Sequence, residues 1–468
     1  MTSHSENARQ WVHIGSGAFA LLLRVLNGWQ AAAMAAIALI FNLVLLPRIG
    51  GRRLYRPVDH ERGFPLGILL YPLSVLLLML AFPARLDIAA AAWGILAFGD
   101  GFATLVGRSR TEKTAENAKH AEKKDLSAIF AISPVFSGRI PWNPDKSIAG
   151  TLAFMVCGSV AAVALAVWVR PSVTPMPPLA FSIAAPLAAA LLAALVETIP
   201  VRLDDNISVP ATAALVLWIA SLMTAAAAAG ARDAVAAALP WAIGVNLVTG
   251  WLAYRARTVS QSGAISGALV GTIIYAGGGA GAWGLLMVTF LAASVTSRFG
   301  LARKEELGIA EERGGRRGAG NVIANCGVAA IAAIAAVTTP WTSLALVALV
   351  TALTAGGSDT VASEIGKAWG RSTFLVTTLG GVKPGTPGAM SLEGTAAGLI
   401  AALVLAATGA ALGLIPSSAI LIVVAAATAG ALVESALGAT LEGPGILNND
   451  MLNFINTAVA AGVAVAFA

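Results

Sequence analysis

Charged residues are scarce in this chain of 468 residues, and that scarcity excludes several classes of protein. Asp, Glu, Lys and Arg together make up 12% of the sequence, whereas soluble domains carry about 25%. So little charge cannot coat the surface of a soluble enzyme of this length, and 57% hydrophobic residues exclude a disordered chain. The net charge is only +6, so we expect no nucleic-acid partner.

Cysteine and histidine are also nearly absent. Cys157 and Cys326 lie inside apolar runs, so no disulfide framework is expected. His120 is the last of four histidines, which excludes a histidine-ligated metal in all of the chain that follows it. Residues 1–10 are polar and of mixed charge, and this argues against a secretory signal.

Long apolar runs dominate what is present. A membrane-spanning helix needs about 20 mostly apolar residues, and such runs recur from 13–27 to the C-terminus. We therefore predict an all-α, polytopic integral membrane protein with about 14–15 transmembrane helices. Two short runs, 264–277 and 282–297, are separated by consecutive glycines, a break that is tolerated where a helix lines a cavity.

The basic residues gather in a few segments, at 48–62, 107–147 and 298–317. Alternation of the predicted helices places these segments on one side of the bilayer and leaves short, nearly uncharged loops on the other. The excess of Lys and Arg assigns the first side to the cytoplasm. The polar motifs described below fall on that face, so we expect active sites on the cytoplasmic face of the plasma membrane.

The chain divides near residue 230 into two fused helical bundles, residues 1–230 and 231–468. Each bundle has its own polar motifs, and no repeat of the halves is visible in the sequence. Residues 109–138 are rich in Ala, Lys and Glu and low in complexity. We interpret them as an inserted solvated helix or loop that carries no chemistry.

A Gly-Asp-Gly motif interrupts an apolar run in the first half. An acid inside a membrane span costs about 2.5–3.5 kcal/mol, so each one is a candidate site. Asp100 is flanked by Gly99 and Gly101, and the missing side chains would let a phosphate or a metal ion approach the backbone. An Asp that caps a broken helix is the alternative interpretation.

Two further polar motifs border later runs of the first half. Lys146 and Ser147 precede an apolar run, and the free N–H groups at the start of a helix suit a phosphate. Glu197 is followed by Asp204-Asp205-Asn206. Carboxylate and amide oxygens are ligands that suit Mg²⁺, although a solvated turn before a helix would have the same sequence.

In this order the three motifs resemble the polyprenol kinase family, which includes dolichol kinase, phytol kinase and, more distantly, CDP-diacylglycerol synthase. The likeness covers roughly residues 9–225, with Ala149 where the family usually has Glu. It implies a kinase that uses CTP and Mg²⁺ to phosphorylate an isoprenoid alcohol in the membrane. The implied catalytic residues are Asp100, Lys146 and Asp205, the metal ligands Asp100, Asp204 and Asp205, and the nucleotide- or phosphate-binding residues Gly99, Gly101, Ser147 and Asn206.

The second half carries longer motifs. Arg298, Arg316 and Arg317 lie near glycines and a predicted helix start, and guanidinium groups bind polyphosphate through two hydrogen bonds at once. A plain basic loop would explain the charge but not the glycines. Asp359 and Glu364 are five residues apart, which places them roughly 140° apart on a helix, so they need not share one ligand.

Other polar residues follow in or beside apolar runs. The loop 382–394 is rich in Gly and Pro, contains Lys383 and Gly385, and could surround an anion with backbone amides. Glu434 lies inside an apolar run, and Asn449 opens the last one among several other amides. Such residues in membrane spans are typical of a polar cavity.

These stretches resemble the phytyl-phosphate kinase family and its transmembrane protein 19 relatives, over roughly residues 235–465. The segment Asp359-Thr360-Val361-Ala362-Ser363-Glu364-Ile365-Gly366 is the most specific part, and Glu434 stands where the family often has Asp. The resemblance implies phosphorylation of a prenyl monophosphate to the diphosphate. The implied catalytic residues are Asp359 and Glu364, the metal ligand is Asp359, and the phosphate contacts are Arg298, Arg316, Arg317, Lys383, Gly385 and Asn449.

Together the two resemblances imply a bifunctional membrane kinase with two successive phosphorylations. Its partners would be an isoprenoid alcohol and its phosphate, CTP or another nucleoside triphosphate, and the lipid bilayer. The sequence has neither a Gly-x-x-x-x-Gly-Lys-Ser/Thr loop nor the catalytic sequence of soluble protein kinases. Two alternatives stay open: a secondary transporter, whose polar site would lie near the bilayer midplane, and a cytidylyltransferase that makes a CDP-lipid.

Overall fold

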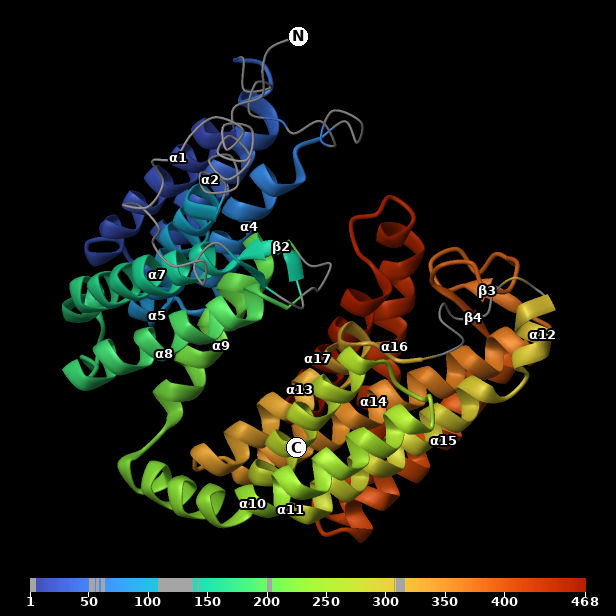
Figure 1. Ribbon diagram of the computed structural model, residues 1–468. Helices are drawn as coiled ribbons and strands as arrows, with labels where there is room; N and C mark the ends of the chain where they lie inside the picture. The colour runs from blue at the N-terminus through green and yellow to red at the C-terminus, as the bar shows by residue number, and fades with distance from the viewer. Residues whose placement is uncertain are drawn as a thin grey trace, which may run out of the picture. The chain divides into compact units, whose positions relative to one another are not determined.

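The computed structural model describes residues 6–49, 55, 59, 64–107, 138–140, 143–199, 204–306, 308 and 316–468. The predicted insertion 109–138 lies outside these residues except for its last one. Most described residues are helical, which confirms the predicted all-α class. The chain forms two compact units, unit 1 (Met1–Ser221) and unit 2 (Leu222–Ala468) (Figure 1). Residues 230–233, near which the sequence was divided, lie inside the helix Ala225–Arg255.

Among the described residues, 12 helices are long and apolar enough to cross a membrane, against about 15 predicted runs. Two runs that do not form long helices and two that merge into one helix account for the difference. The run 13–27 is interrupted, because an α-helix ends at Ser16 and a 3-10 helix follows. Leu66–Ala81 is apolar but has only 16 residues. The runs 264–277 and 282–297 belong to one kinked helix.

The centre of unit 1 is the span Leu86–Gly107, whose most apolar stretch is 78% buried. Four consecutive alanines, at 89–92, are all fully buried there, and such small side chains let neighbouring helices approach closely. The elements of unit 1 are α1 (Glu6–Ser16), η1 (Gly17–Arg24), α2 (Gly28–Ile40), η2 (Phe41–Leu45), α4 (Leu66–Ala81), α5 (Leu86–Gly94), η4 (Ile95–Asp100), β1 (Arg139–Ile140), β2 (Asn143–Ser147), α7 (Ile148–Val169), η6 (Arg170–Ser172), α8 (Leu179–Glu197) and α9 (Asp205–Leu222).

Unit 2 is built around α14, of which the most apolar stretch is 72% buried. The other helices pack on α14 or on each other (Figure 1). The elements of unit 2 are α10 (Ala225–Arg255), α11 (Gln261–Arg298), α12 (Leu301–Glu306), α13 (Ala319–Thr338), α14 (Thr342–Trp369), β3 (Thr373–Leu375), β4 (Ala389–Ser391), α15 (Leu392–Ala411), η8 (Ser417–Ala419), α16 (Ile420–Leu437), η9 (Gly438–Glu442) and α17 (Asn449–Phe467).

Helix α11 reverses direction at its glycine break. Gly279 has a φ of 77°, a left-handed conformation that glycine adopts without strain. The guanidinium of Arg298, at the end of α11, donates a hydrogen bond of 2.9 Å to the carbonyl of Ala256, just before its start. The two ends of α11 therefore lie at the same end of unit 2, as expected for a broken helix that lines a cavity.

A short antiparallel strand pair leads into a helix in each unit. β1 pairs with β2, and β3 pairs with β4. The hydroxyl of Ser147 accepts a hydrogen bond of 3.1 Å from the Gly150 N–H at the start of α7. Ser391 does the same for Gly394 at the start of α15, at 3.0 Å. Both serines are N-caps, the position for which Ser is among the preferred residues.

Candidate functional site

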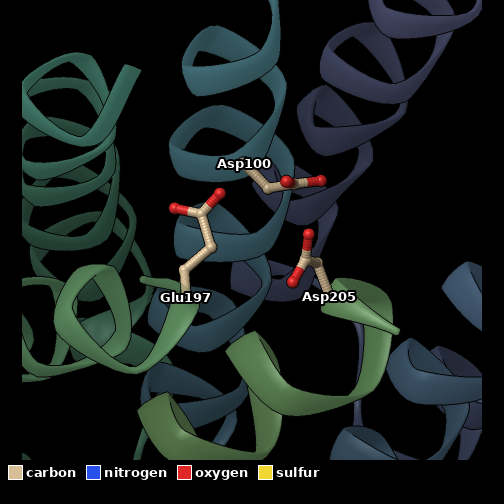
Figure 2. A group of neighbouring side chains, drawn as sticks. All are labelled: Asp100, Glu197 and Asp205. Atoms are coloured by element: carbon tan, nitrogen blue, oxygen red, sulfur yellow. The ribbon is translucent and has the colours of Figure 1, made fainter. Parts of the chain in front are cut away.

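Three carboxylates meet in unit 1. Asp100 ends η4, Glu197 is the last residue of α8 and Asp205 is the first residue of α9. One oxygen from each lies within 4.8 Å of the others, and the side chains turn toward a common point (Figure 2). Asp100 and Glu197 are buried, and Asp205 is partly exposed. Carboxylates from three different elements at this spacing can hold a divalent cation.

The ammonium group of Lys146 joins two of these carboxylates. Its Nζ lies 2.6 Å from an oxygen of Glu197 and 2.8 Å from an oxygen of Asp205. Burial alone would lower the pKa of Lys146, but the charges of Glu197 and Asp205 outweigh burial and raise that pKa well above its ordinary value. Lys146 therefore stays charged throughout the physiological range, and its side chain, 27% exposed, is accessible to an anionic substrate.

His13 lies beside the cluster of three carboxylates. The imidazole of His13, on α1, donates from Nε2 to the carbonyl of Leu96 at 3.1 Å and lies 3.7 Å from Asp100. Burial lowers the pKa of His13 to about 4. This effect is larger than the rise in pKa that the hydrogen bond to Leu96 causes. His13 is therefore neutral near pH 7, and its contact with Asp100 is not an ion pair at that pH.

Asp204 directly precedes α9, and Asn206 is the second residue of that helix. The carboxylate of Asp204 accepts hydrogen bonds from the backbone and the side chain of Asn206, at 2.9 and 2.7 Å. The hydroxyl of Ser74 donates to the Asn206 carbonyl at 2.5 Å. These bonds orient Asp205 toward Asp100, while Asp204 lies outside the cluster of three carboxylates. The structure thus brings together Asp100, Lys146 and Asp205, as predicted, and places Asp204 beside them.

The two glycines of the Gly-Asp-Gly motif serve helix packing. A Cβ at Gly99 would lie 2.9 Å from the ring of Phe154, and one at Gly101 would clash with Ile14. These glycines therefore allow α7 and α1 to approach the backbone on either side of Asp100. The Ser147 hydroxyl caps α7.

Unit 2 contains a polar cavity of about 300 Å³. Its walls come from five segments: the start of α13, the second half of α14, the loop before α15, the end of α16 with η9, and the start of α17. Most second-half motifs of the sequence thus meet at one end of this unit. The charged residues that line the cavity are Arg317, Asp359, Lys367, Glu434 and Glu442.

Asp359 and Glu434 form the acidic wall of this cavity. Their side chains, on α14 and α16, are hydrogen-bonded to each other. The amide of Asn456 donates a hydrogen bond of 2.7 Å to the carboxylate of Glu434. The sequence marked Glu434 as an acid within a span but gave it no role, as it did for Glu197. The shared signal is an acid near the C-terminal end of an otherwise apolar helix.

Glu364 has a different position from Asp359. Its carboxylate forms an ion pair with Lys304 of α12, and both side chains are 2% exposed. Lys367 approaches the same carboxylate at 3.9 Å. The ion pair with Lys304 ties α12 to α14, and Glu364 is not in the cavity wall. This agrees with the prediction that Asp359 and Glu364 need not share a ligand.

The predicted phosphate contacts separate into two groups. Arg317, Gly385 and Asn449 line the cavity, whereas the described lining does not include Arg298, Arg316 or Lys383, whose side chains are exposed. The backbone of Arg317 is held by hydrogen bonds to Thr258 and Ser260.

A second, mostly apolar cavity of about 100 Å³ adjoins the polar one. It lies among α10, α11, α13 and α14, and the two cavities share Arg317 and Asn321 in their walls. At the start of α11 its wall has little side-chain bulk, because Gly263, Ala264 and Gly267 line it there. The outer faces of α10 and α11 carry exposed large apolar residues. The polar cavity therefore has an apolar extension between helices that are apolar on their outside.

Comparison with known proteins identifies relatives for unit 2. A family model described as integral membrane protein DUF92 matches residues 244–461. Uncharacterized membrane protein sll0875 of Synechocystis is 38% identical over 235 residues, which are 49% of this chain and 91% of that protein. Uncharacterized membrane protein MJ0933 of Methanocaldococcus jannaschii is 32% identical over 212 residues, which are 45% of this chain and 86% of that protein.

A plant protein is similar as well. Protein VTE6, chloroplastic, of Arabidopsis thaliana is 36% identical over 214 residues, which are 44% of this chain and 64% of VTE6. No solved structure matches the chain. The family model lies entirely within unit 2, so the likeness of unit 1 to polyprenol kinases stays a prediction.

Proposed function

The chain belongs, through unit 2, to the DUF92 family of integral membrane proteins, and on this premise we propose that it is a membrane phosphotransferase acting on isoprenoids. Unit 2 would convert a prenyl monophosphate into the diphosphate, and unit 1 would make the monophosphate from the alcohol. The resemblances of the two halves to phytyl-phosphate and polyprenol kinases support this assignment. The donor would be CTP or another nucleoside triphosphate.

One observation carries the proposal. In unit 2, motifs more than 100 residues apart in the sequence, from Arg317 to Asn449, line one polar cavity that adjoins an apolar one. Phosphoryl transfer requires mainly positioning and neutralisation of charge. A cavity with both acids and cations can place a nucleotide and a phosphate acceptor, and a neighbouring apolar cavity can take part of a lipid tail. A transporter does not require this pairing of polar and apolar cavities at one end of a bundle.

The apolar cavity suits the part of the tail nearest the phosphate. An apolar cavity of about 150 Å³ accepts a benzene molecule, so the volume of about 100 Å³ here is on the scale of a single isoprene unit. Arg317 and Asn321, at the junction, would then lie beside the phosphate. The rest of the tail would extend into the bilayer past α10 and α11, whose outer faces are apolar.

In unit 1 the residues fit a Mg²⁺ ion. Asp100, Glu197 and Asp205 supply three oxygen ligands within 4.8 Å of one another, the donor type that Mg²⁺ prefers. Bound there, Mg²⁺ would neutralise charge on the nucleotide phosphates. Lys146 would hold a phosphate oxygen, and one carboxylate would accept the proton of the alcohol. The oxygen–phosphorus bond to the acceptor forms as the bond between the β and γ phosphates breaks, and the nucleoside diphosphate leaves.

The solubility of the substrates determines where the reaction can occur. Isoprenoid substrates and products stay in the bilayer while the nucleotide is in water, so transfer must occur at the membrane surface. The excess of basic residues in the loops favours the cytoplasmic face of the plasma membrane for both sites.

A labelled-lipid assay tests the proposal. Purified protein in lipid nanodiscs is incubated with farnesol or farnesyl monophosphate, Mg²⁺, and CTP that carries the label either in its γ-phosphate or in its cytidine. We expect γ-phosphate label in the lipid and no cytidine label. Cytidine label in the lipid would indicate a cytidylyltransferase, and no labelled lipid with any nucleotide would contradict the proposal.

A further inference from the structure

The two units share one arrangement of elements. In unit 1 the span Leu86–Gly107 leads to the β1–β2 pair and then to α7, α8 and α9. In unit 2, α14 leads to the β3–β4 pair and then to α15, α16 and α17. In both units the strand pair ends on a serine that caps the next helix. The order of the elements and the cap therefore recur, although no repeat was visible in the sequence.

The packing around the serine cap recurs at the level of single residues. In unit 1 a Cβ added to Gly150 would meet the Ala103 carbonyl and the Cα of Gly107. In unit 2 a Cβ added to Gly394 would meet the Ala362 carbonyl and the Cα of Gly366. Asp100 precedes Ala103 by three residues and Gly107 by seven. Asp359 has the same spacing to Ala362 and Gly366.

The other two acids of the unit 1 cluster also have counterparts in unit 2. Ala-Leu-Val-Glu occurs at 194–197 and at 431–434, so Glu197 corresponds to Glu434. Asp205 is the first residue of α9, and Asn449 is the first residue of α17. Asp100, Glu197 and Asp205 of unit 1 thus correspond to Asp359, Glu434 and Asn449 of unit 2, and all of the latter line the polar cavity.

The two copies differ where the acceptor would bind. Lys146 directly precedes the capping Ser147, and Met390 directly precedes Ser391. The ion pair between Lys146 and Asp205 in unit 1 is therefore replaced by Met390 and Asn449 in unit 2. Both replacements line the 300 Å³ cavity, whose charged residues Arg317, Asp359, Lys367, Glu434 and Glu442 lie elsewhere in its wall.

The chemistry of two acceptors explains this difference. An alcohol must lose a proton when its oxygen attacks the γ-phosphate, and a nearby carboxylate can accept it. A phosphate monoester is already largely ionised at pH 7, with a second pKa of about 6, and its oxygen attacks without giving up a proton. A further carboxylate at the position of Asn449 would be unnecessary and would add to the repulsion from the acids already in the cavity wall.

We propose that the two units are copies of one phosphoryl-transfer site, in which the charged Lys146 and Asp205 of unit 1 belong to a site for an alcohol and the neutral Met390 and Asn449 of unit 2 admit a phosphate-bearing acceptor. This inference rests on the proposed function and extends it to the choice of acceptor. In unit 1 the oxygen–phosphorus bond forms while the hydroxyl proton moves to a carboxylate. In unit 2 the same bond forms with no proton transfer, and in both the nucleoside diphosphate leaves.

The test measures binding of the acceptor without nucleotide, using farnesyl monophosphate and farnesol with the full-length protein in nanodiscs. Asn449→Asp gives unit 2 the acid that unit 1 has at the corresponding position, Asp205, and the new side chain has the same shape as Asn. We expect it to weaken binding of farnesyl monophosphate roughly tenfold at low ionic strength, less at high salt, and to leave farnesol binding within about twofold. An acid at a helix start is favourable for the helix, so the variant should fold.

Asn448→Asp is the matched control. It adds the same charge one residue earlier, keeps a side chain that can cap α17, and lies outside the cavity wall. We expect wild-type binding of farnesyl monophosphate. Equal effects of the two substitutions, or no effect of Asn449→Asp, would overturn the inference, as would failure of the wild-type protein to bind farnesyl monophosphate.

The catalytic half of the inference is tested in unit 1. Asp205→Asn should abolish transfer to farnesol while transfer to farnesyl monophosphate continues, and retained transfer to farnesol would overturn the role of Asp205. Failure of the proposed function has a different signature. If the wild-type protein binds farnesyl monophosphate but never phosphorylates it, the kinase proposal is wrong, and Asn449→Asp still decides which acceptor the cavity admits.

Discussion

The ammonium of Lys146 lies 2.6 Å from a carboxylate oxygen of Glu197, across 51 residues of sequence. This bond connects the strand before α7 with the end of α8. The same ammonium group donates a second hydrogen bond, of 2.8 Å, to Asp205 at the start of α9. Three elements of unit 1 are thus held together at the point where a nucleotide phosphate would bind. This one contact therefore serves both the fold and the proposed chemistry.

Replacing Lys146 with Met should affect unit 1 alone. The substitution leaves Glu197 without its cation and introduces the residue type that unit 2 has at the corresponding position. We expect transfer to farnesol to fall by about 100-fold or more, because the donor phosphate loses a charged hydrogen-bond partner. Transfer to farnesyl monophosphate serves as the internal control and should be unchanged. An equal loss of both reactions would show that the effect is on folding.

The buried pair of Lys304 and Glu364 should be structural. Removal of one partner of a buried ion pair typically costs about 3–5 kcal/mol, so Lys304→Met should lower the thermal unfolding temperature clearly. The double variant Lys304→Met with Glu364→Leu removes both buried charges, leaves only the partly exposed Lys367 without its neighbouring carboxylate, and should recover most of that loss. Recovery of transfer to farnesyl monophosphate in the double variant would support the structural role. If the double variant is stable but does not phosphorylate farnesyl monophosphate, Glu364 is a catalytic residue, as the family resemblance implies.

His13 should make unit 1 sensitive to acid. Its pKa is lowered to about 4 in the folded protein, whereas an exposed histidine titrates near 6.5. Between these values the unfolded chain binds a proton that the folded chain does not, so stability falls as pH decreases from about 6.5 to 4. His13→Gln should remove this part of the loss. Unfolding of both proteins across this pH range measures the difference, and parallel curves would contradict the assignment.

The apolar cavity can be filled without disturbing the fold. A Cβ at Gly267 would have no atom within 4 Å, and Gly267 lines the cavity. Gly267→Phe should therefore raise the KM for farnesyl monophosphate about tenfold or more, with a smaller effect on kcat. Gly244→Phe is the matched control, since Gly244 is equally uncrowded and outside the cavity wall. The same KM in both variants would exclude this cavity as the site of the tail.

The sequence predicted most of the membrane spans and several of the polar residues that the structure brings together, for physical reasons. Apolar runs of sufficient length can only be helices in a bilayer, and Asp100, Lys146 and Asp205 were recognisable because charge beside such runs is costly. Helix spacing also indicated that Asp359 and Glu364 face different directions.

Other features depend on tertiary packing and were not predictable. Whether Glu364 or Glu434 shares a site with Asp359 depends on which helices neighbour α14. Gly99 and Gly101 looked like a place for a ligand, yet their missing side chains accommodate Phe154 and Ile14. The correspondence that we propose between the two units became visible through the order of their elements and through equivalent contacts at Gly150 and Gly394.

The most direct test of two separate sites is product analysis of two single variants, Asp100→Asn and Asp359→Asn, with farnesol, farnesyl monophosphate and γ-labelled CTP. We predict that Asp100→Asn abolishes monophosphate formation and still converts supplied monophosphate to diphosphate. Asp359→Asn should do the reverse, so that farnesyl monophosphate accumulates from farnesol. If either single change removed both reactions in a protein that remains folded, the account of two sites would be contradicted.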